Sequence, residues 1–585
     1  MNSVLAKGLT AAGLLTVMWA ACAAAGDWTP PESGQMGRAN GNTIEVDSLA
    51  DGSDPAACTL RDAVRSANED TAHGGCQSGQ VGQDTIVFSV NGEIVLTAGV
   101  IAVTEDLIIS GPGAGELTVN GNQIAAIFDI DGANAGQAND VHIADLTLTN
   151  AGDSNLVGTG AIFAQGVDNL VLEHVHLIDN QWKGLEIDFR ASGTAILNSV
   201  ISGNNRVGVR SFSSDLLVVH DTIISANAGG GVWSAGDLHV FDSQITNNLV
   251  GSITSYGGVT VNGGELVLHD SVVSANAGDS VGAGVWFEGF DLDIQRTTIA
   301  GNQTDSSGGG AFIRVFSQGL IADSAIHGNT SGAEGGGLML RQFSGPGSEP
   351  ALRIVNTTIS GNQAPRGGGV YVHRQAFHLA HLEHVTIVDN TATDPVLSLG
   401  GGISFRNDTG TIRLFNSVVA DNQAADGNGN DVVAWTSAEV NPAPGDVDTG
   451  EELELDYTLV TDANGFAPTG TGNLFGDDPL LGPLGDNGGP TVSHHPQAAS
   501  PLLNAGDPAF APPPEHDQRG PGFPRVLGGR TDMGAIEADF DRLFDDRFEE
   551  PGAGGTSQLA TVVGRVAGLE LDSSAAARPM AEEER

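Results

Sequence analysis

Basic residues are scarce in this chain of 585 amino acids. It has 24 Lys and Arg against 72 Asp and Glu, which gives a formal net charge of −48. No Lys/Arg-rich block interrupts this acidity, and neutralising phosphates requires clustered basic side chains. The sequence therefore argues against a nucleic-acid partner and indicates a well-solvated surface. Aromatic residues are also few, at 5%, which does not fit a thick globular core.

Long apolar runs are absent after the first 25 residues, so no membrane-spanning helix is predicted there. Residues 1–25 combine Lys7, an apolar run from Gly8 to Trp19 and a small-residue end. This is the pattern of a secretory signal peptide. Cys22 also admits lipidation, although Trp19 is a poor third residue before a lipidated cysteine. We therefore expect an exported protein, secreted or held at a cell surface.

Glycine, in contrast, is abundant at 83 residues, and it belongs to an internal repeat. At Leu352–Val372 an alternating apolar run leads to an Ile-x-x-Asn step and then to three glycines. One copy could not bury its own apolar face, and self-similarity along a chain is the signature of a solenoid. The step recurs every 21 to 33 residues and ends at Asn180, Asn204, Asn227, Asn248, Asn276, Asn302, Asn329, Asn362, Asn390 and Asn422.

Strand-type alternation precedes each of these asparagines, and no segment shows a helical period over a dozen residues. Two or three short strands per turn of roughly 20–30 residues predict an all-β, parallel β-helix. The Asn amides would then stack at one corner, and the glycines would occupy a corner that needs positive φ or close packing. An antiparallel sandwich is the alternative, and in-phase repetition disfavours it.

The repeats resemble those of bacterial right-handed β-helix proteins. The Asn step with Gly-Gly-Gly is similar to polymorphic outer membrane protein repeats, and this resemblance implies secretion or a place at the bacterial cell surface or outer membrane. We assign residues 122–430 to β-helix repeats, with roughly 15 coils between Asp84 and Leu481 at ~4.8 Å per coil.

Two cysteines remain if Cys22 leaves with the signal peptide, and export favours a disulfide between Cys58 and Cys76. Between them, Thr59 and the residues that follow it predict a short amphipathic helix that covers the open end of the solenoid. The string Cys58-Thr-Leu-Arg-Asp-Ala63, with Thr43–Asp47 and Asp84–Phe88, resembles the CSLREA domain of secreted bacterial β-helices. Thr59 and Asp62 depart from that pattern. The resemblance covers residues 43–121 and implies an N-terminal cap.

The C-terminal part carries four strings in order, and we group residues 431–540 as the last coils and a Gly/Pro-rich cap of the other end. The strings are Asp478–Thr491, Ser500–Asp507, Asp517–Gly520 and Asp532–Glu537. Together they resemble the choice-of-anchor Q domain, which implies surface display or secretion. Residues 541–585 hold a Phe-Glu sorting-like motif at Phe548, with Arg547 where Gly is common, and a low-complexity tail that we expect to be disordered.

Ligand-binding candidates come from the strands that follow the glycines, where residues two and four places after the last Gly should face outward. These two columns predict a stripe of large apolar side chains beside a basic row. Aromatic faces suit sugar rings and Arg forks suit carboxylates or sulfates, although stacking on the next coil would explain the aromatic residues equally well. The candidates are Trp233, Trp286, Phe312, Tyr371, Arg314, Arg341, His373 and Arg406.

Catalytic chemistry has less support in the sequence. Glu186 and Asp188 lie two apart on one strand, at a spacing of roughly 7 Å that suits an inverting glycosidase. Outward acids are nevertheless common on an acidic protein. The string Asp426–Asp431 offers oxygen ligands for Ca²⁺, but it lacks the Gly and Glu of an EF-hand loop and is interpreted as a loop. No metal site or cofactor is predicted.

The sequence therefore favours a monomeric, non-enzymatic surface scaffold or adhesin that contacts a polysaccharide or a host or cell-surface glycan. A polysaccharide lyase or glycoside hydrolase on the same scaffold is the alternative.

Overall fold

The computed structural model describes most of the chain between residues 40 and 538. The described ranges are 40–131, 139–152, 160–188, 193–212, 215–249, 257–341, 352–373, 380–396, 399–406, 412–425, 427, 429–435, 453–462 and 470–538. The predicted signal peptide (residues 1–25) and the predicted sorting-like motif and tail (residues 541–585) lie outside these residues. No helix within them is long and apolar enough to cross a bilayer.

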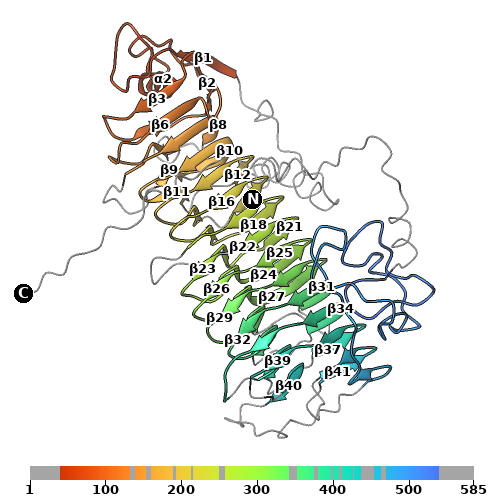
Figure 1. Ribbon diagram of the computed structural model, residues 1–585. Coiled ribbons are helices and arrows are strands. Elements are labelled where there is room, and N and C mark those ends of the chain that lie inside the picture. Colours follow the sequence, from red (N-terminus) through yellow and green to blue (C-terminus); the bar gives the residue numbers. More distant parts are fainter. Residues whose placement is uncertain are drawn as a thin grey trace, which may run out of the picture. The chain divides into compact units, whose positions relative to one another are not determined.

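The fold is a parallel β-helix, as the repeats predict (Figure 1). Each coil contributes a strand to as many as three faces, and every strand pairing recorded between coils is parallel. The glycine face holds the strands that follow the glycines. These are β4 (Ile101–Val103), β7 (Phe128–Asp131), β9 (Gly160–Gln165), β11 (Lys183–Ile187), β14 (Val209–Ser211), β17 (Val232–Ser234), β20 (Val259–Asn262), the first parts of β24 (Val285–Gln295) and β27 (Ala311–Ala322), β30 (Leu338–Arg341), β33 (Val370–His373), β36 (Ile403–Arg406) and β40 (Val432–Trp435).

The middle face continues the chain after the glycine face, and the asparagine face precedes the Asn step. The middle face contains β1 (Asn40–Val46), β2 (Gln83–Phe88), β5 (Leu107–Ser110), the first parts of β8 (Asn139–Thr149) and β10 (Val167–Ile178), β12 (Gly193–Leu197), β15 (Leu216–His220), β18 (Leu238–Phe241), β21 (Leu266–His269), the ends of β24 and β27, the first parts of β31 (Leu352–Ser360) and β34 (Ala380–Val388), β37 (Ile412–Phe415) and β41 (Leu453–Asp456).

The asparagine face contains β3 (Gly92–Val95), β6 (Leu117–Asn120), the ends of β8, β10, β31 and β34, β13 (Val200–Ser202), β16 (Ile223–Ser225), β19 (Gln244–Thr246), β22 (Val272–Ser274), β25 (Thr298–Ala300), β28 (Ala325–His327), β38 (Val418–Ala420), β42 (Leu459–Val460) and β43 (Leu474–Phe475). A small separate sheet follows the Asn corner. It contains β23 (Ala277–Gly278), β26 (Gln303–Thr304), β29 (Thr330–Ser331), β32 (Gln363–Ala364), β35 (Thr391–Ala392) and β39 (Gln423–Ala424).

The predicted asparagine corner is a continuous ladder of side-chain amides. From Asn180 to Asn422, the Nδ2 atom of each repeat asparagine donates to Oδ1 of the next one, at 2.8–3.0 Å. The ladder ends where Asn422 donates to the carboxylate of Asp431 at 2.9 Å. All of these side chains are buried, so each unmade bond would leave a buried polar group unsatisfied. The asparagines thus fix the register between coils.

A second ladder, not anticipated from the sequence, lies at the corner between the middle and asparagine faces. In several coils the backbone N–H of the corner Ser or Thr donates to the hydroxyl of the corner residue in the next coil, as from Thr222 to Ser243 at 3.1 Å and from Ser243 to Ser271 at 3.1 Å. The residue before each hydroxyl has positive φ, such as Asp221 at 46° and Asp270 at 51°. Asp and Asn tolerate this backbone conformation, which explains the recurring Asp-Ser, Asp-Thr and Asn-Ser pairs.

Glycines at this corner are required by close contact between coils. A Cβ atom on Gly284 would lie 2.4 Å from the carbonyl oxygen of Gly310, and one on Gly310 would lie 2.5 Å from that of Gly337. Gly308, the first of its triplet, has φ of 76°. Only glycine fits both requirements.

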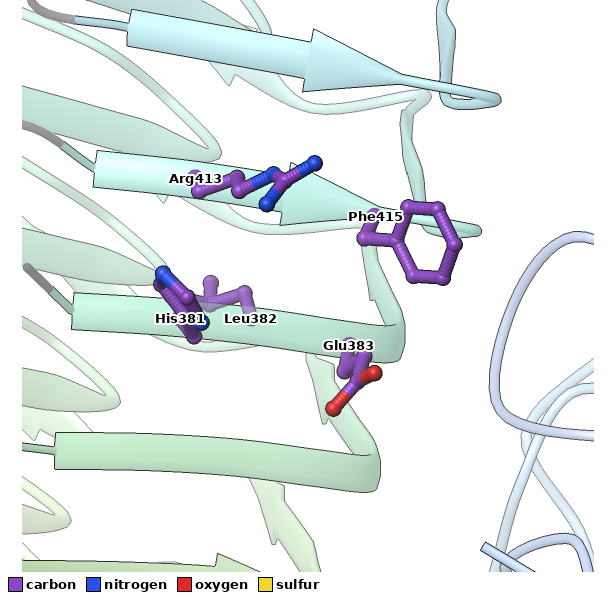
Figure 2. Close-up of a pocket in the computed structure, with 5 residues that line it drawn as sticks. All are labelled: His381, Leu382, Glu383, Arg413 and Phe415. Atoms are coloured by element: carbon purple, nitrogen blue, oxygen red, sulfur yellow. The ribbon is translucent and has the colours of Figure 1, made fainter. Parts of the chain in front are cut away.

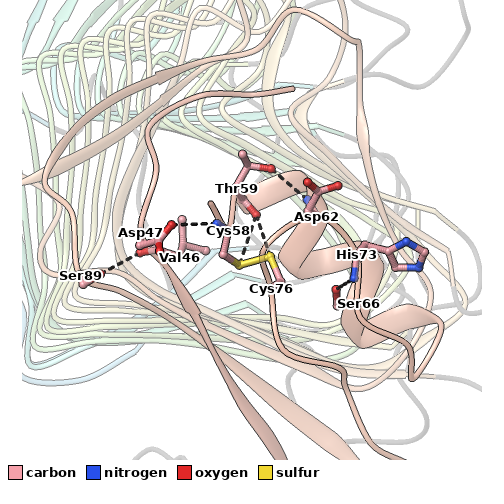
Figure 3. Close-up of a disulfide and its surroundings, with 9 residues drawn as sticks. All are labelled: Val46, Asp47, Cys58, Thr59, Asp62, Ser66, His73, Cys76 and Ser89. Atoms are coloured by element: carbon pink, nitrogen blue, oxygen red, sulfur yellow. Dashed lines mark hydrogen bonds between the residues drawn. A yellow bond between two sulfur atoms is a disulfide. The ribbon is translucent and has the colours of Figure 1, made fainter. Parts of the chain in front are cut away.

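The N-terminal cap is confirmed (Figure 3). Cys58 and Cys76 form a disulfide. Helix α2 (Leu60–Asn68) begins after Thr59, whose hydroxyl accepts a hydrogen bond from the Asp62 backbone N–H at 3.2 Å. The helix buries its apolar side chains against β1, β2 and β4, which lie in the first coils. It therefore covers the first end of the core.

The Gly/Pro-rich part of residues 431–540 was predicted to cap the other end, and this placement is wrong for most of its described segment, residues 470–538. Figure 1 shows the segment, in blue, beside β31, β34 and β37. Gln518 accepts a hydrogen bond from Thr358 at 2.6 Å, and the Ala535 N–H donates to Thr386 at 2.9 Å. Thr358 and Thr386 are neighbours on the asparagine face. The segment therefore covers the side of several successive coils.

One of the strings that identified this segment, Asp532–Glu537, takes part in a buried ionic network around Arg525. Arg525 is fully buried and donates to the carbonyl oxygens of Gly534 and Ala535, both at 3.0 Å. It also lies 3.4 Å from the carboxylate of Glu537. Burial raises the pKa of Glu537 to about 7, and Arg525 opposes that rise. These residues clamp the turns of the segment together, which gives the strings a structural role.

Candidate glycan-binding face

The two outward columns of the glycine face have the predicted register. Cα partners run through the first column from coil to coil. In order, this column contains Glu186, Arg210, Trp233, Thr260, Trp286, Phe312, Met339, Tyr371 and Ser404. Exposure, however, varies along the column: Arg210, Trp233 and Trp286 are half-buried, and the other six residues are buried.

The C-terminal half of the column is buried. Phe312 is 4% exposed and Tyr371 is 0% exposed, and with Met339 they form an apolar cluster separate from the main core. Val281 and Leu399, each just before a glycine corner, pack over this cluster, and Trp286 is half-buried against it. The prediction that Phe312 and Tyr371 present aromatic faces to a ligand is therefore wrong, because neighbouring coils already cover these rings.

The predicted basic row is also divided. Arg314 forms an ion pair with Glu288 of the adjacent coil at 2.9 Å and lies over the Phe316 ring. Arg341 is exposed. His373 is half-buried and stacks on Tyr371, with ring centroids 6.4 Å apart. Arg406 lies in β36, and its side chain is outside the described part of the structure. The row is therefore not a continuous basic surface.

The N-terminal half of the glycine face carries a different group, which we call the open patch: Trp182, Arg206, Arg210, Phe212 and Trp233. Arg206 is exposed, and the other four side chains are half-buried. The Arg206 guanidinium lies 4.5 Å from the centroid of the Trp182 ring. The Arg210 guanidinium lies 4.1 Å from that of Phe212 and 5.4 Å from that of Trp233. Two guanidinium groups thus lie against aromatic rings.

Sequence reasoning included Trp233 among the candidates but missed Trp182 and Arg206. These two residues lie at the corner before the glycine face, where the Arg206 N–H donates to the Trp182 carbonyl at 2.8 Å. Each is the second residue after a ladder asparagine, Asn180 and Asn204. That shared offset places them in adjacent coils, and it is the signal that could have found them.

Below the open patch, Lys183 and Glu186 form a buried ion pair. Their side chains are 7% and 4% exposed, respectively. Burial, together with Arg210 and Arg206, lowers the pKa of Lys183 to about 7. Glu186 was the first member of the predicted catalytic pair, and its burial contradicts that role, because a general acid or base must reach the substrate. Asp188 is half-buried just beyond the end of β11.

A small depression lies on the middle face between β34 and β37 (Figure 2). His381, Leu382 and Glu383 line it from one strand, and Arg413 and Phe415 from the next. Its volume of about 130 Å³ is well below the several hundred Å³ typical of small-molecule pockets. Arg413 is paired with Asp456 at 3.0 Å. This depression does not resemble the walled groove expected of a glycosidase or lyase.

The last residue of the predicted loop Asp426–Asp431 ends the asparagine ladder. Asp431 accepts hydrogen bonds from Asn422 and from the Asp462 N–H at 2.6 Å, and burial raises its pKa to about 6. Asp426 and Asn428 lie outside the described residues. Within the described ranges, no group of three or more His, Cys, Asp or Glu side chains has a geometry that could hold a metal ion.

Comparison with known proteins supports the fold. Residues 107–273 match the family model described as a right handed beta helix region, so the solenoid is right-handed. Among solved structures, the chain is similar to the crystal structure of pectate lyase Pel9A, at 13% identity and a TM-score of 0.23. That match covers 85% of this chain and 96% of the lyase. No curated protein matches the chain.

Proposed function

We propose that this protein is a secreted or cell-surface β-helix scaffold that binds glycans through the open patch. The observation that carries the proposal is the pair of guanidinium groups on aromatic faces, Arg206 on Trp182 and Arg210 on Phe212 and Trp233. A half-exposed ring offers an apolar face to a sugar. A guanidinium oriented on it offers paired donors to a hydroxyl or an acidic group.

Rigidity supports this assignment. Arg210 and Trp233 lie on neighbouring strands in direct register, and Trp182 and Arg206 follow ladder asparagines in adjacent coils. The site therefore requires little ordering on binding, which lowers the entropic cost of association. The Cys58–Cys76 disulfide is typical of exported chains. The CSLREA-like N-terminal string and the choice-of-anchor Q-like strings favour export and surface display.

The test is binding of the mature protein to a glycan array that includes acidic polysaccharides, with release of reducing ends monitored. We expect saturable binding without product. Arg210→Ala should lose at least about tenfold in affinity, the order expected for one charge-assisted contact. Trp233→Ala, which removes an aromatic face, should also lower affinity.

Arg341→Ala is the matched control, because Arg341 is an exposed arginine on the same face but outside the open patch. Its affinity should equal that of the wild type. A loss as large as that of Arg210→Ala would show that binding is not confined to the open patch. Product release would replace this proposal with the lyase or hydrolase alternative, and absence of any binding would refute it.

A further inference from the structure

The most exposed aromatic side chain among the described residues is Phe290, at 59%. It lies in β24 where the chain passes from the glycine face to the middle face, and its ring meets that of Phe316 on β27 edge to face, with centroids 6.1 Å apart. We call Phe290 and Phe316 the corner pair. Neither side chain belongs to an apolar cluster of the described core, so core packing does not explain their presence.

The local backbone orients these two rings. β24 and β27 continue through the corner, whereas the two preceding coils break there into separate strands, β17 and β18, then β20 and β21. The register slips by one residue, so that Phe290 lies opposite two residues of β27, Phe316 and Ser317. Such a bulge bends a strand and redirects its side chains. The Phe290 N–H also donates to the Gly264 carbonyl of the preceding coil at 3.0 Å. Backbone contacts therefore fix the position of the corner pair.

The corner pair follows the open patch along the solenoid. Phe212 of the open patch precedes Phe290 by three coils and lies two residue positions nearer the glycines. At ~4.8 Å per coil and ~3.3 Å per residue, the two side chains are roughly 15 Å apart. In the two coils between them, the positions equivalent to Phe290 are Gly236 and Gly264. Glycine has no side chain, so at this position nothing projects between the two aromatic groups.

We propose, on the basis of the glycan-binding function above, that the corner pair is a second sugar subsite and that the ligand is a linear polysaccharide lying along the solenoid. An aromatic ring offers an apolar face to a sugar. Beside the corner pair, the ion pair of Glu288 and Arg314, whose side chains are 30% and 29% exposed, offers an acceptor and donors to sugar hydroxyls. The Arg314 guanidinium also lies 5.1 Å from the centroid of the Phe316 ring.

The distance between the two groups determines the length of the ligand. A single sugar ring cannot contact two groups that are roughly 15 Å apart, so only a chain occupies both. Contact with the second group then follows within the same complex, which raises the overall affinity without any new contact at the first group. Affinity should therefore increase with chain length, which distinguishes a polysaccharide ligand from a terminal sugar.

The experiment is calorimetric titration of the mature protein with two oligomer series, one of galacturonic acid and one of the glucose units of cellulose. A disaccharide is the short probe, and an oligomer of about eight rings, longer than the roughly 15 Å between the groups, is the long probe. The wild type should bind the long probe more tightly than the disaccharide. Phe290→Ala should lower the affinity for the long probe by about two- to tenfold and leave that for the disaccharide unchanged.

Phe475→Ala is the matched control, because Phe475 is also exposed, at 47%, but lies in β43 on the asparagine face. Its affinity should equal that of the wild type for both probes. Phe290→Trp keeps an aromatic ring and should keep the dependence on length. Equal urea unfolding midpoints for the wild type and Phe290→Ala would show that a lower affinity is not caused by unfolding.

The outcomes separate the second subsite from the proposed function. Equal wild-type affinity for both probes, or no difference between Phe290→Ala and Phe475→Ala, would overturn the second subsite and leave the proposed function intact. An equal loss for the disaccharide in Phe290→Ala would also overturn it, because Phe290 would then belong to a single site. Dimerisation of the wild type that Phe290→Ala abolishes would assign the corner pair to contact between copies and overturn the subsite. Binding of neither series would overturn both proposals.

Discussion

Removal of one amide from the middle of the asparagine ladder should destabilise the protein strongly. Asn302 makes four side-chain hydrogen bonds in the structure. Its Oδ1 accepts from the backbone N–H and from Nδ2 of Asn276, both at 3.0 Å. Its Nδ2 donates to the Val273 carbonyl at 2.9 Å and to Asn329 Oδ1 at 3.0 Å. Asn302→Ala leaves the buried Asn276 N–H and the Val273 carbonyl without these partners.

The size of the effect follows from the two groups that would lose their bonds. A buried donor or acceptor without a partner costs about 1–3 kcal/mol. Two such groups, together with the mispaired Asn276 amide, predict a loss of about 3–6 kcal/mol in the free energy of unfolding. The neighbouring residue Gln303 is exposed on β26, and Gln303→Ala should change this free energy by less than about 0.5 kcal/mol.

The assay is urea unfolding followed by circular dichroism, with both variants measured beside the wild type. Equal midpoints for Asn302→Ala and Gln303→Ala would refute the argument that the ladder stabilises the coils. Asn302→Asp refines the test. An ionised carboxylate cannot donate to the Val273 carbonyl, whereas a protonated one can. The folded-state pKa of this Asp should therefore be raised, and the stability of this variant relative to the wild type should increase as pH falls through that pKa.

Two further predictions concern the glycine corner and the C-terminal segment. Gly284→Ala should lower the free energy of unfolding by at least about 1 kcal/mol, because its Cβ atom would lie 2.4 Å from the Gly310 carbonyl oxygen. Gly52→Ala is the control, because a Cβ atom there would have nothing within 4 Å. Similar melting temperatures for the two variants would contradict the packing argument. The Glu537 carboxyl, with its pKa raised to about 7, binds more protons in the folded state than in the unfolded state between about pH 4.3 and 7. It should therefore lower stability as pH rises through that window. Glu537→Gln should remove this part of the pH dependence. The measurement is the difference in unfolding midpoint between the wild type and this variant at pH 5 and at pH 7.5. An unchanged difference would refute the prediction.

The candidate site shows where sequence reasoning reaches its limit. Period-2 alternation correctly gave the register of Arg210 with Trp233 and of Met339 with Tyr371, because strand geometry alone fixes which residues share a column. Alternation cannot tell whether a column is covered. Val281 and Leu399 cover Phe312 and Tyr371, and both lie at corners, outside the strands on which the prediction was based. Trp182 and Arg206 were missed for the same reason, because they too lie at corners outside the strands.

Spacing likewise suggested a catalytic pair at Glu186 and Asp188 but could not reveal the partner of Glu186. Lys183 lies three residues earlier on the same strand, and the two buried side chains form an ion pair. Such a contact depends on local burial, which a sequence pattern does not encode.

The sequence by itself determined the solenoid, its asparagine ladder, the glycine corners and the disulfide-linked N-terminal cap. These features repeat or are local, so each copy of a pattern reports the same backbone requirement. Only the tertiary structure decided that the Gly/Pro-rich segment covers the side of the coils rather than their end, and which half of the glycine face is open. Both depend on contacts between residues far apart in the chain, as in the pairing of Thr358 with Gln518, and the repeat pattern carries no record of such contacts.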